Sequence, residues 1–367
     1  MKDSVSVIGA GTAGLIAAKR LAQLGVETTV YDQKKVLGHP VRASGILSIR
    51  GLDGLGIDYG RAVTNTLHGA RIHSGGETME IRAGAPVAKV LDRKLLNDLC
   101  HDEAVANGAN VMLGSRVAGH ALEALSEANI VVGADGAVSE VAKHFRMGDI
   151  GRYAVTYKAE YNIRHDDPGL VDLFFDPGVS RGLFAWFCPN AEDILEIGIG
   201  VDSKAGNAKA SFQKFLSLPR VSSVIGSSRP VSEGASIIPL ALRTKIVDND
   251  RGIVLVGDAA GQVKPSTGGG IIYGGNASLM AARSIKNHIE GNASLEEYRK
   301  AYMRKYSLDT RLHAFANWIY SRAGEKEFGF ALRVLRGLGV GSFLGRYGDM
   351  DMPSSILRNL LLGITFA

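Results

Sequence analysis

Residues 251–284 read RGIVLVGDAAGQVKPSTGGGIIYGGNASLMAARS, and the expected fold can be built outward from them. Ile253 to Val256 form a short apolar run rich in β-branched residues, which predicts a buried parallel strand. Gly257 and Asp258 follow directly and would end this strand with a carboxylate. Open α/β sheets bind their ligands at this carboxyl edge, so we expect Asp258 to face a ligand.

A long helix is expected after the loop that follows. Its apolar residues recur at spacings of three and four, at Leu279, Ala282, Ile285 and Ile289. The glycines 268–270 open this helix, and a glycine-rich helix start offers free N–H groups with about half a positive charge. Strand, acid, loop and helix start together predict a site for a large anionic or electron-rich cofactor.

The N-terminal segment carries a second ligand-binding pattern. Ser4 to Ile8 are predicted to form a strand, Leu15 to Leu24 a helix and Glu27 to Tyr31 another strand. Between the first two lies GAGTAG at 9–14, and Asp32 follows the second strand, 18 residues after the last glycine. This order is the dinucleotide-binding fingerprint, which by itself does not separate FAD from NAD.

The residues of this fingerprint have separate expected roles. Gly9 permits the tight turn, Gly11 lets the pyrophosphate approach the backbone, and Gly14 lets the helix pack close to the strand. Asp32 would accept hydrogen bonds from the adenosine ribose hydroxyls. Asp135 is a further glycine-flanked acid after a predicted buried strand, and either a cofactor contact or a turn would explain it.

The middle of the chain has a different pattern. From Thr156 to Val201 hydrophobic residues alternate in four runs, TYKAEYNI, VDLFF, GLFAWF and ILEIGIGV, which Asp, Pro and Gly turns separate. These runs predict one antiparallel sheet and hence a second domain, and an alternating hairpin is expected around Gly75 and Gly76. Such a sheet, inserted between parts of a dinucleotide-binding domain, would place a substrate cavity at the junction.

The predicted fold class is α/β with a discontinuous first domain. A Rossmann-like domain, a parallel sheet with helices on both faces, is expected from residues 1–66, 84–150 and 245–290. Residues 67–83 and 151–244 would form the antiparallel-sheet substrate domain. The remaining part, 291–367, is predicted to be a helical C-terminal region, with helices expected at 296–320 and 328–335.

Composition and charge narrow the classes of protein. Two cysteines among 367 residues argue against a disulfide framework and for a reducing, cytoplasmic interior. No apolar run reaches the roughly 20 residues that span a bilayer, and no signal peptide is expected before the first strand. The net charge of +5 fits either a solvated surface or attraction to phosphates and anionic membranes.

Two further classes of site have no sequence signal. The nine histidines show no HxH or HxxxH spacing, so no metal site is predicted. No basic-aromatic stripe suggests nucleic acid as a partner.

Four segments resemble a known group of enzymes. GxGxxG near the start, Asp-Arg at 92–93, GADG at 133–136 and GDAAG with a later GGG resemble the FAD enzymes of the para-hydroxybenzoate-hydroxylase type. Within that group the chain looks most like the geranylgeranyl reductases, especially archaeal enzymes that saturate digeranylgeranylglycerophospholipids. GHPVR at 38–42 and FAWFCP at 184–189 carry this narrower resemblance, which covers about residues 1–306.

The resemblance implies FAD as the cofactor. Asp258 would hydrogen-bond the ribityl chain, Arg93 would lie beside the ribityl–pyrophosphate part, and the helix after Gly270 would aim N–H groups at the flavin pyrimidine edge. The residues then expected to bind the cofactor are Gly9, Gly11, Ala13, Gly14, Asp32, Arg42, Ala43, Arg93, Asp135, Gly257, Asp258, Gly268, Gly269, Gly270 and Ile271. The alternative for Asp258 is a cap or turn acid, and the alternative for Arg93 is a surface ion pair.

The resemblance also implies a substrate and a reaction. Trp186 and Phe184 share one face of a predicted strand and would form an aromatic wall that holds an apolar chain over the flavin, with core packing as the alternative. The implied reaction saturates C=C bonds of a geranylgeranyl (prenyl) chain on an archaeal-type ether phospholipid precursor, by hydride transfer from flavin N5. The family usually has cysteine where Ala43 stands, so the proton donor is unassigned, with a bound water or Tyr273 as candidates.

Two other functions share these cofactor motifs. One is an FAD-dependent aromatic hydroxylase or monooxygenase, and the other is an electron-carrier or non-catalytic flavoprotein that binds lipid. The electron donor, whether NAD(P)H, ferredoxin or another carrier, is not encoded in any motif. The C-terminal run ILRNLLLGITFA at 356–367 either packs as a helix or contacts the cytoplasmic membrane face through which a lipid substrate enters.

Overall fold

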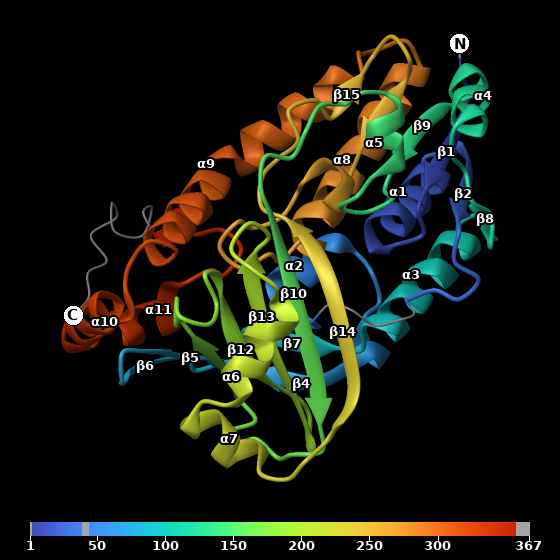
Figure 1. Ribbon diagram of the computed structural model, residues 1–367. Helices are drawn as coiled ribbons and strands as arrows, with labels where there is room; N and C mark the ends of the chain where they lie inside the picture. Colours follow the sequence, from blue (N-terminus) through green and yellow to red (C-terminus); the bar gives the residue numbers. More distant parts are fainter. Residues whose placement is uncertain (1, 39–43, 357–367) are drawn as a thin grey trace.

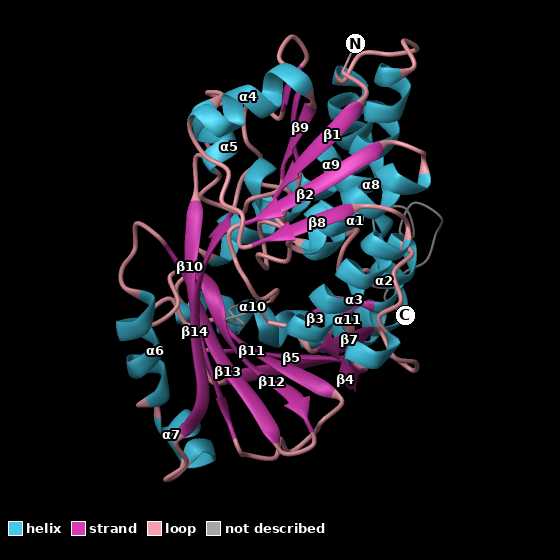
Figure 2. Cartoon of the chain, turned by 90° about the vertical axis from the view of Figure 1, so that its right-hand side faces the viewer, coloured by secondary structure: helices cyan, strands magenta, loops and turns pink. Residues whose placement is uncertain are grey.

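The computed structural model describes residues 2–38 and 44–356 of the chain. A parallel sheet with its helices lies at one end of the molecule and a long, mainly antiparallel sheet at the other (Figures 1 and 2). The helix α9 (Glu296–Tyr320) runs alongside both, from the parallel sheet down to the C-terminal helices (Figure 1).

The first sheet has six strands in the order β15-β16-β9-β1-β2-β8. Their bounds are β1 Ser4–Ile8, β2 Glu27–Asp32, β8 Asn110–Leu113, β9 Ile130–Gly133, β15 Val247–Asp248 and β16 Ile253–Leu255. β15 pairs with β16 in the antiparallel sense, and the other neighbours are parallel. The central strands are buried almost throughout, because helices cover a parallel sheet and leave little of it to solvent.

Helices pack around this sheet. α1 (Thr12–Gln23) packs against both α3 (Arg93–Ala106) and α8 (Ile271–Ile289). The shorter helical elements are α2 Ile49–Leu55, η1 Gly60–Ala62, α4 His120–Ala128, α5 Glu140–His144 and η2 Gly257–Ala260. α3 begins where it does because Asp92 caps it, with its Oδ1 accepting from the backbone N–H groups of Lys94 and Leu95 at 2.8 and 3.0 Å.

The second sheet has seven strands in the order β14-β10-β13-β12-β11-β5-β6. Their bounds are β5 Gly69–Ser74, β6 Glu77–Arg82, β10 Tyr153–Tyr161, β11 Leu170–Phe174, β12 Gly182–Ala191, β13 Ile194–Asp202 and β14 Pro230–Pro239. The expected purely antiparallel sheet is corrected at one pair, because β5 and β11 run parallel. The β5–β6 hairpin comes from earlier in the chain and attaches to the edge left free by β11, so no hairpin turn fixes its direction.

The two faces of this sheet differ in what covers them. Side chains alternate along β12 and β13, so Phe187 and Ile197 lie on one face, where α6 (Ala208–Leu216) and α7 (Pro219–Ile225) lie. Phe184 and Trp186 lie on the other face, which we call the inner face, and pack with Val90 of the neighbouring small sheet.

This small sheet, β3 (Ile46–Ser48), β7 (Ala88–Leu91) and β4 (Val63–Leu67), was not predicted. Its strands are only three to five residues long and lack a clear alternating pattern. It bridges the parallel sheet region and the inner face, because β7 runs into Asp92 and the start of α3.

The C-terminal region is helical, as expected. α9 has the predicted bounds, and α10 (Glu325–Gly337) is longer than the predicted 328–335 and is followed by α11 (Val340–Tyr347). The predicted α/β fold class is thereby confirmed. Within residues 2–38 and 44–356 no single helix has the length and apolar content of a membrane span, whereas α10 and α11 together, bent by 74°, pass that test of length and composition.

Candidate active site

Three loops meet at one edge of the parallel sheet. β9 lies between β1 and β16, so the residues after these strands, Gly9, Ala134 and Val256, start neighbouring loops. Because carboxyl ends of parallel strands share an edge, the N-terminal glycine turn and the Gly257–Asp258 segment lie beside each other. The sequence motifs 9–14, 133–136 and 257–270 are therefore parts of one site.

The glycine turn leaves a space that suits a pyrophosphate. Gly9 has φ +109°, and a Cβ there would lie 2.4 Å from the carbonyl oxygen of Ala134. A Cβ on Gly14 would lie 2.0 Å from the Gly9 carbonyl oxygen, so both positions require glycine. By contrast, no described atom lies within 4 Å of a Cβ built on Gly11. Gly11 caps α1 without a side-chain hydrogen bond from the described chain, so the helix start faces open space.

Asp32 holds the glycine turn in shape. Its Oδ2 accepts from the backbone N–H of Ala10 at 2.7 Å, and its Oδ1 accepts from the N–H of Lys34 at 2.8 Å. A carboxylate has about four acceptor positions, so these bonds leave room for two ribose hydroxyls. The adenosine-binding role of Asp32 stays a prediction, and this geometry is compatible with it.

Asp258 and Arg93 are charges without local partners. In the described chain no hydrogen bond to the Asp258 carboxylate and no ion pair within 4.0 Å to Arg93 is found, and Arg93 Nε is a buried donor without an acceptor. Burial raises the pKa of Asp258, and the Arg93 charge opposes that rise. Burial lowers the pKa of Arg93. Because unpaired buried polar groups are costly, this pair is expected to face a ligand rich in hydroxyls and phosphates.

The glycine triplet fits closely under Asp258. A Cβ on Gly270 would lie 2.8 Å from Asp258 Oδ1, and one on Gly269 would lie 2.8 Å from Lys264 Cε. α8 begins at Ile271, with Gly270 as its cap and no side-chain cap within the described residues. The Asp258 carboxylate therefore lies beside the start of α8, where free N–H groups favour an anionic or electron-rich ligand.

A buried polar cluster behind this loop was missed by the sequence reasoning. Lys264 and Asp351, each 5% exposed, form an ion pair of 2.7 Å, and Ser48 also donates to Asp351. The hydroxyl of Tyr273 donates to the Asp351 carbonyl oxygen at 2.8 Å. The cluster ties the flavin-side loop to the segment after α11, and its only sequence signal is a lysine inside an otherwise apolar, glycine-rich stretch.

Of the other residues predicted to bind the cofactor, some have local structural contacts and two lie outside the described residues. Asp135 accepts from Ser139 Oγ and, at 3.0 Å, from the Val141 N–H at the start of α5. It therefore has a local structural role, and its contact with the cofactor stays a prediction. Ala13 and Gly257 approach each other, since a Cβ on Gly257 would lie 2.8 Å from Ala13 Cβ. Arg42 and Ala43 lie outside the described residues.

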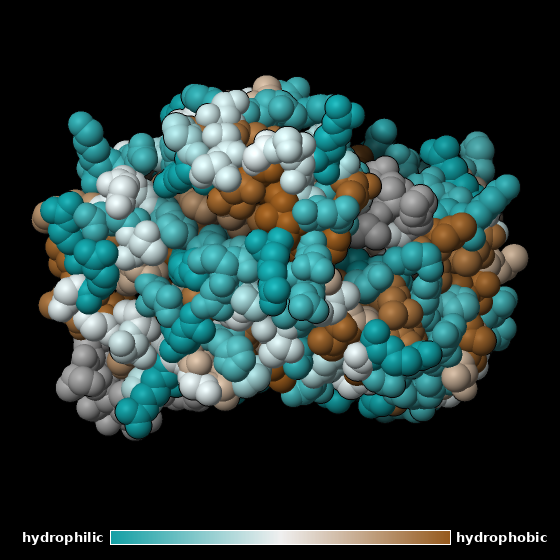
Figure 3. Space-filling model, turned by 90° about the horizontal axis from the view of Figure 1, so that it is seen from below, coloured by the Kyte–Doolittle hydropathy of each residue, from teal (hydrophilic) through white to brown (hydrophobic). Residues whose placement is uncertain are grey.

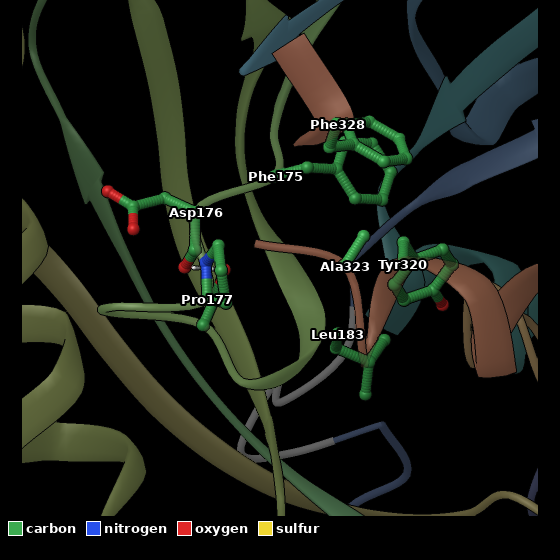
Figure 4. A pocket seen from close by; sticks show the side chains of 8 residues that line it. Phe175, Asp176, Pro177, Leu183, Tyr320, Ala323 and Phe328 are labelled. Carbon is green, nitrogen blue, oxygen red and sulfur yellow. Dashed lines mark hydrogen bonds between the residues drawn. The ribbon is translucent and has the colours of Figure 1, made fainter. Parts of the chain in front are cut away.

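The aromatic residues predicted for the substrate wall lie on the inner face. Phe184 and Trp186 are 8% and 9% exposed, and their ring centroids are 6.2 Å apart. The row continues from Phe184 to Phe175 at 5.4 Å, and from Phe175 to Phe328 of α10 at 5.1 Å and Tyr320 of α9 at 5.0 Å. Figure 4 shows the rings of Phe175 and Phe328 side by side, with Tyr320 across a narrow space. Phe175, Tyr320 and Phe328 line a cavity of about 10 Å³.

Comparison with known proteins identifies the family. A family model of an NAD(P)-binding Rossmann-like domain matches residues 7–79. A digeranylgeranylglycerophospholipid reductase of Methanothermobacter thermautotrophicus is 30% identical over 303 residues, which cover 76% of this chain and 76% of that protein. This chain belongs to the digeranylgeranylglycerophospholipid reductase family. A second digeranylgeranylglycerophospholipid reductase, from Methanosphaera stadtmanae, is 28% identical over 349 residues, covering 88% of this chain and 85% of its own length.

Solved structures agree on the fold of this reductase family member. A geranylgeranyl bacteriochlorophyll reductase-like protein from Thermoplasma acidophilum superposes with a TM-score of 0.79 at 20% identity, covering 97% of this chain and 95% of that one. A probable FAD-dependent monooxygenase from Pseudomonas aeruginosa reaches 0.65 at 14% identity, with 90% and 99% covered. The chain therefore has the fold of FAD-dependent oxidoreductases, and the predicted family, Rossmann-type domain and FAD cofactor are confirmed.

Proposed function

We propose that this protein is an FAD-dependent reductase that saturates C=C bonds of a geranylgeranyl chain on an archaeal-type ether phospholipid precursor. The observation that carries the proposal is the extended similarity to reductases whose names specify this lipid, at 28 and 30% identity over most of both chains. Solved structures of flavin-dependent halogenases and FAD-dependent monooxygenases share the fold, with TM-scores between 0.64 and 0.69, below the 0.79 of the reductase-like protein.

The residues present fit FAD. Gly9, Gly11 and Asp32 would hold the adenosine end, and Asp258 with Arg93 would hold the ribityl and pyrophosphate part. The open space at Gly11 and the unpartnered Arg93 Nε are what such a ligand would fill and satisfy. Reduced FAD, when bound, supplies a hydride from N5 to one alkene carbon, while a proton is added to the other.

The inner face would hold the alkene. Its aromatic rings offer an apolar wall that excludes water and positions a chain without hydrogen-bonding groups. Tyr273 does not suit the role of proton donor, because its hydroxyl already donates to the Asp351 carbonyl oxygen and burial raises its pKa well above the usual range. Of the two donors expected from the sequence, a bound water is the one compatible with this geometry.

The reaction can be tested directly. Purified protein is reduced with dithionite without oxygen, mixed with a digeranylgeranyl glycerophospholipid, and the lipid is analysed by mass spectrometry. The proposal predicts product heavier by whole pairs of hydrogen atoms. Unchanged lipid mass would contradict it. Oxygen consumption with NAD(P)H and a small aromatic compound would point to a hydroxylase, and lipid binding with all double bonds intact would indicate a non-catalytic flavoprotein.

We further propose that the C-terminal helices contact an anionic membrane surface. Large apolar side chains are exposed on α9 and α10, including Phe315, Trp318 and Phe330 at 59, 50 and 66%, and Leu338, at the C-cap of α10, is 61% exposed. Residues 311–367 hold seven basic and four acidic side chains, so 7 − 4 gives a net charge of +3. Figure 3 shows patches of apolar atoms at the left end of the molecule, where Figure 1 places α10.

The aromatic row supports this placement. It runs from Trp186 on the inner face through Phe184 and Phe175 to Phe328, which belongs to the exposed helix α10. A prenyl chain that leaves the bilayer at α10 would meet aromatic side chains all the way to the inner face. The predicted apolar tail, 357–367, lies outside the described residues, and the cytoplasmic location stays a prediction.

Vesicle binding tests the membrane contact. Wild-type protein should sediment with phosphatidylglycerol vesicles and much less with phosphatidylcholine vesicles, since basic residues near a membrane add about 1 kcal/mol each on an anionic surface. Phe330→Ser combined with Leu338→Ser should reduce sedimentation, whereas Val138→Ser, at an exposed apolar position beyond β9, should not. Equal sedimentation of all three proteins would reject α10 as the contact.

A further inference from the structure

A buried charged network lies beside the aromatic rings on the inner face. Lys158 of β10, Trp186 of β12 and Glu196 of β13 are 4, 9 and 2% exposed. Trp186 Nε1 donates to Glu196 Oε1 at 2.8 Å, and Lys158 Nζ lies 2.6 Å from Glu196 Oε2. The two carboxylate oxygens of Glu196 therefore have different tasks, one holding the indole and the other the ammonium group.

The strand register brings these residues together. Gly198 of β13 pairs with Lys158 on one side and with Trp186 on the other, and Glu196 is two residues away on the same face. A Cβ on Gly198 would lie 2.1 Å from Cζ2 of Trp186, so the indole lies over this glycine. One face of the indole thus packs on the backbone of Gly198, and its N–H group is held by the hydrogen bond to Glu196.

Stability alone does not account for this ion pair. Apart from Glu160, whose carboxylate lies 3.5 Å from Lys158 Nζ, the neighbouring side chains of the inner face are apolar and include Leu183, Phe184 and Cys188. Buried ion pairs can often be replaced by apolar residues of similar volume at no cost or with a gain in stability. A charged pair in an otherwise apolar wall is therefore better explained by the geometry it imposes on the group it holds, the Trp186 indole.

The network also lies close to the cofactor-binding residues. Burial lowers the pKa of Arg93, one of the two charges of the site without an ion pair in the described chain, and the negative charges of Asp258 and Glu196 oppose this shift. Glu196 therefore lies near enough to Arg93 to influence it, while Arg93 also interacts with Asp258. The indole that Glu196 holds lies in one buried cluster with Val90 of β7, the strand that leads through Asp92 to Arg93.

We infer that Glu196, with its charge balanced by Lys158, is a positioning residue that fixes the indole of Trp186 in the substrate wall. This inference rests on the proposed prenyl reduction, in which the wall sets the distance between alkene and flavin. The hydrogen bond acts on the substrate through Trp186 alone. Its loss lets the ring turn and misplaces the alkene, and a misplacement of about 1 Å can reduce turnover about a hundredfold.

Two paired double variants separate the hydrogen bond from the charges. Lys158→Met with Glu196→Gln removes both charges but keeps an oxygen that accepts from the indole N–H. Lys158→Met with Glu196→Leu removes both charges and the acceptor, with similar volume. Neither leaves Lys158 or Glu196 as an unpaired buried charge. Glu160, which lies 3.5 Å from Lys158 Nζ and is 21% exposed, keeps its hydrogen bonds from Asn190 and Ser232 in both variants, so both are expected to fold and to bind FAD.

The kinetic test compares kcat for lipid reduction. The Gln variant should stay within about threefold of wild type, and the Leu variant should lose at least about tenfold in kcat, a barrier increase of about 1.4 kcal/mol. The same two double variants are also made in protein that carries Trp186→Phe, which has no indole N–H. There, Gln and Leu at position 196 should give the same kcat. An equal loss in both double variants, or a Gln-to-Leu effect that persists without the indole, would overturn the inference.

A structural readout keeps this test independent of the proposed reaction. The chain has two tryptophans, so protein labelled with 5-fluorotryptophan should give two fluorine NMR signals. The Trp186 signal should be sharp in wild type and the Gln variant, and broadened or split in the Leu variant. Trp318, half-exposed on α9, is the internal reference and should not change. An unaltered Trp186 signal in the Leu variant would overturn the inference, whereas wild type that reduces no lipid would refute the proposed function alone.

Discussion

The indole of Trp186 occupies the place where any side chain on Gly198 would have to go, with only 2.1 Å between ring carbon Cζ2 and a Cβ built on that glycine. Gly198→Ala should therefore push the ring off its position. Overpacking of this kind costs about 1–3 kcal/mol. We expect a lower midpoint in urea unfolding and a reduced kcat for lipid reduction.

Gly54 offers a matched control for this substitution. It lies on the helix α2, and a Cβ built on it would have no atom of the described chain within 4 Å. Gly54→Ala should leave kcat unchanged and stabilise the protein by up to about 1 kcal/mol. If Gly198→Ala had the same urea midpoint and the same kcat as Gly54→Ala, the indole of Trp186 would not be confined by Gly198.

Asp258 should matter for cofactor binding and little for folding. Removal of a hydrogen bond to a charged group costs about 1.5–3 kcal/mol, so Asp258→Ala should weaken FAD binding by about 10- to 150-fold. The apoprotein should gain stability at neutral pH, because burial raises the pKa of this carboxyl and its charged form is unfavourable without a ligand. Flavin fluorescence titration and urea unfolding measure the two effects, with the exposed Glu297→Ala of α9 as control. Unchanged FAD affinity would remove Asp258 from the site.

The His73–Asp172–His165 cluster on the substrate sheet predicts a dependence of stability on pH. Each oxygen of Asp172 is 2.7 Å from Nε2 of one histidine. Burial would raise the pKa of Asp172, but these hydrogen bonds outweigh it and lower the pKa to about 2. Burial would likewise lower the pKa of His165, and Asp172 outweighs it and raises that pKa above 6.5.

The signs of the two shifts define two pH ranges. The Asp172 contribution, about 2 kcal/mol, is present above its ordinary pKa of about 4 and is lost as the pH falls towards 2. The His165 contribution is complete below pH 6.5 and is lost as the pH rises through its raised value. The difference in unfolding free energy between wild type and Asp172→Asn should therefore be largest near pH 5 to 6. A difference that is constant from pH 3 to 9 would contradict this account.

The ion pair between Lys264 and Asp351 should hold the C-terminal segment against the flavin-side loop. Lys264→Met leaves a buried carboxylate with only neutral hydrogen-bond donors and should cost about 3–5 kcal/mol. Lys264→Met with Asp351→Leu should recover part of that loss. Lys286→Met, which breaks a surface pair with Glu290 on α8, should cost less than about 1 kcal/mol. Urea unfolding measures all three, and equal losses for the two lysines would mean that the Lys264 pair is as weak as a surface pair.

Local patterns in the sequence were sufficient for the cofactor half of this structure. Apolar runs that end in glycine predicted β1, β9 and β16, and helical periodicity predicted α9 with its observed ends. These signals are local, because a buried strand and an amphipathic helix each require a regular spacing of apolar residues.

Contacts between distant segments could not be predicted in the same way. Ser48 and Asp351 are 303 residues apart in sequence, and nothing near either residue specifies the other. The parallel pairing of β5 with β11 and the small sheet of β3, β7 and β4 depend on how separate segments dock. The hydrogen bond between Trp186 and Glu196 could not be predicted either. The alternation of side chains along the strands does not show which residues of neighbouring strands are in contact.

The place of Asp351 in the chain has a consequence for biosynthesis. A ribosome makes the glycine turn at 9–14 long before it reaches Asp351, which follows Ser48 by 303 residues. Until then Ser48 and Lys264 lack Asp351, to which both bind, so the loop on the flavin side is not held in place by these contacts. The first domain begins to fold during translation, as N-terminal units do, but its cofactor compartment is completed only after residue 351 has emerged from the ribosome. FAD loading in the cell should thus be a late event, and a message truncated upstream of codon 351 should yield protein that does not retain the flavin.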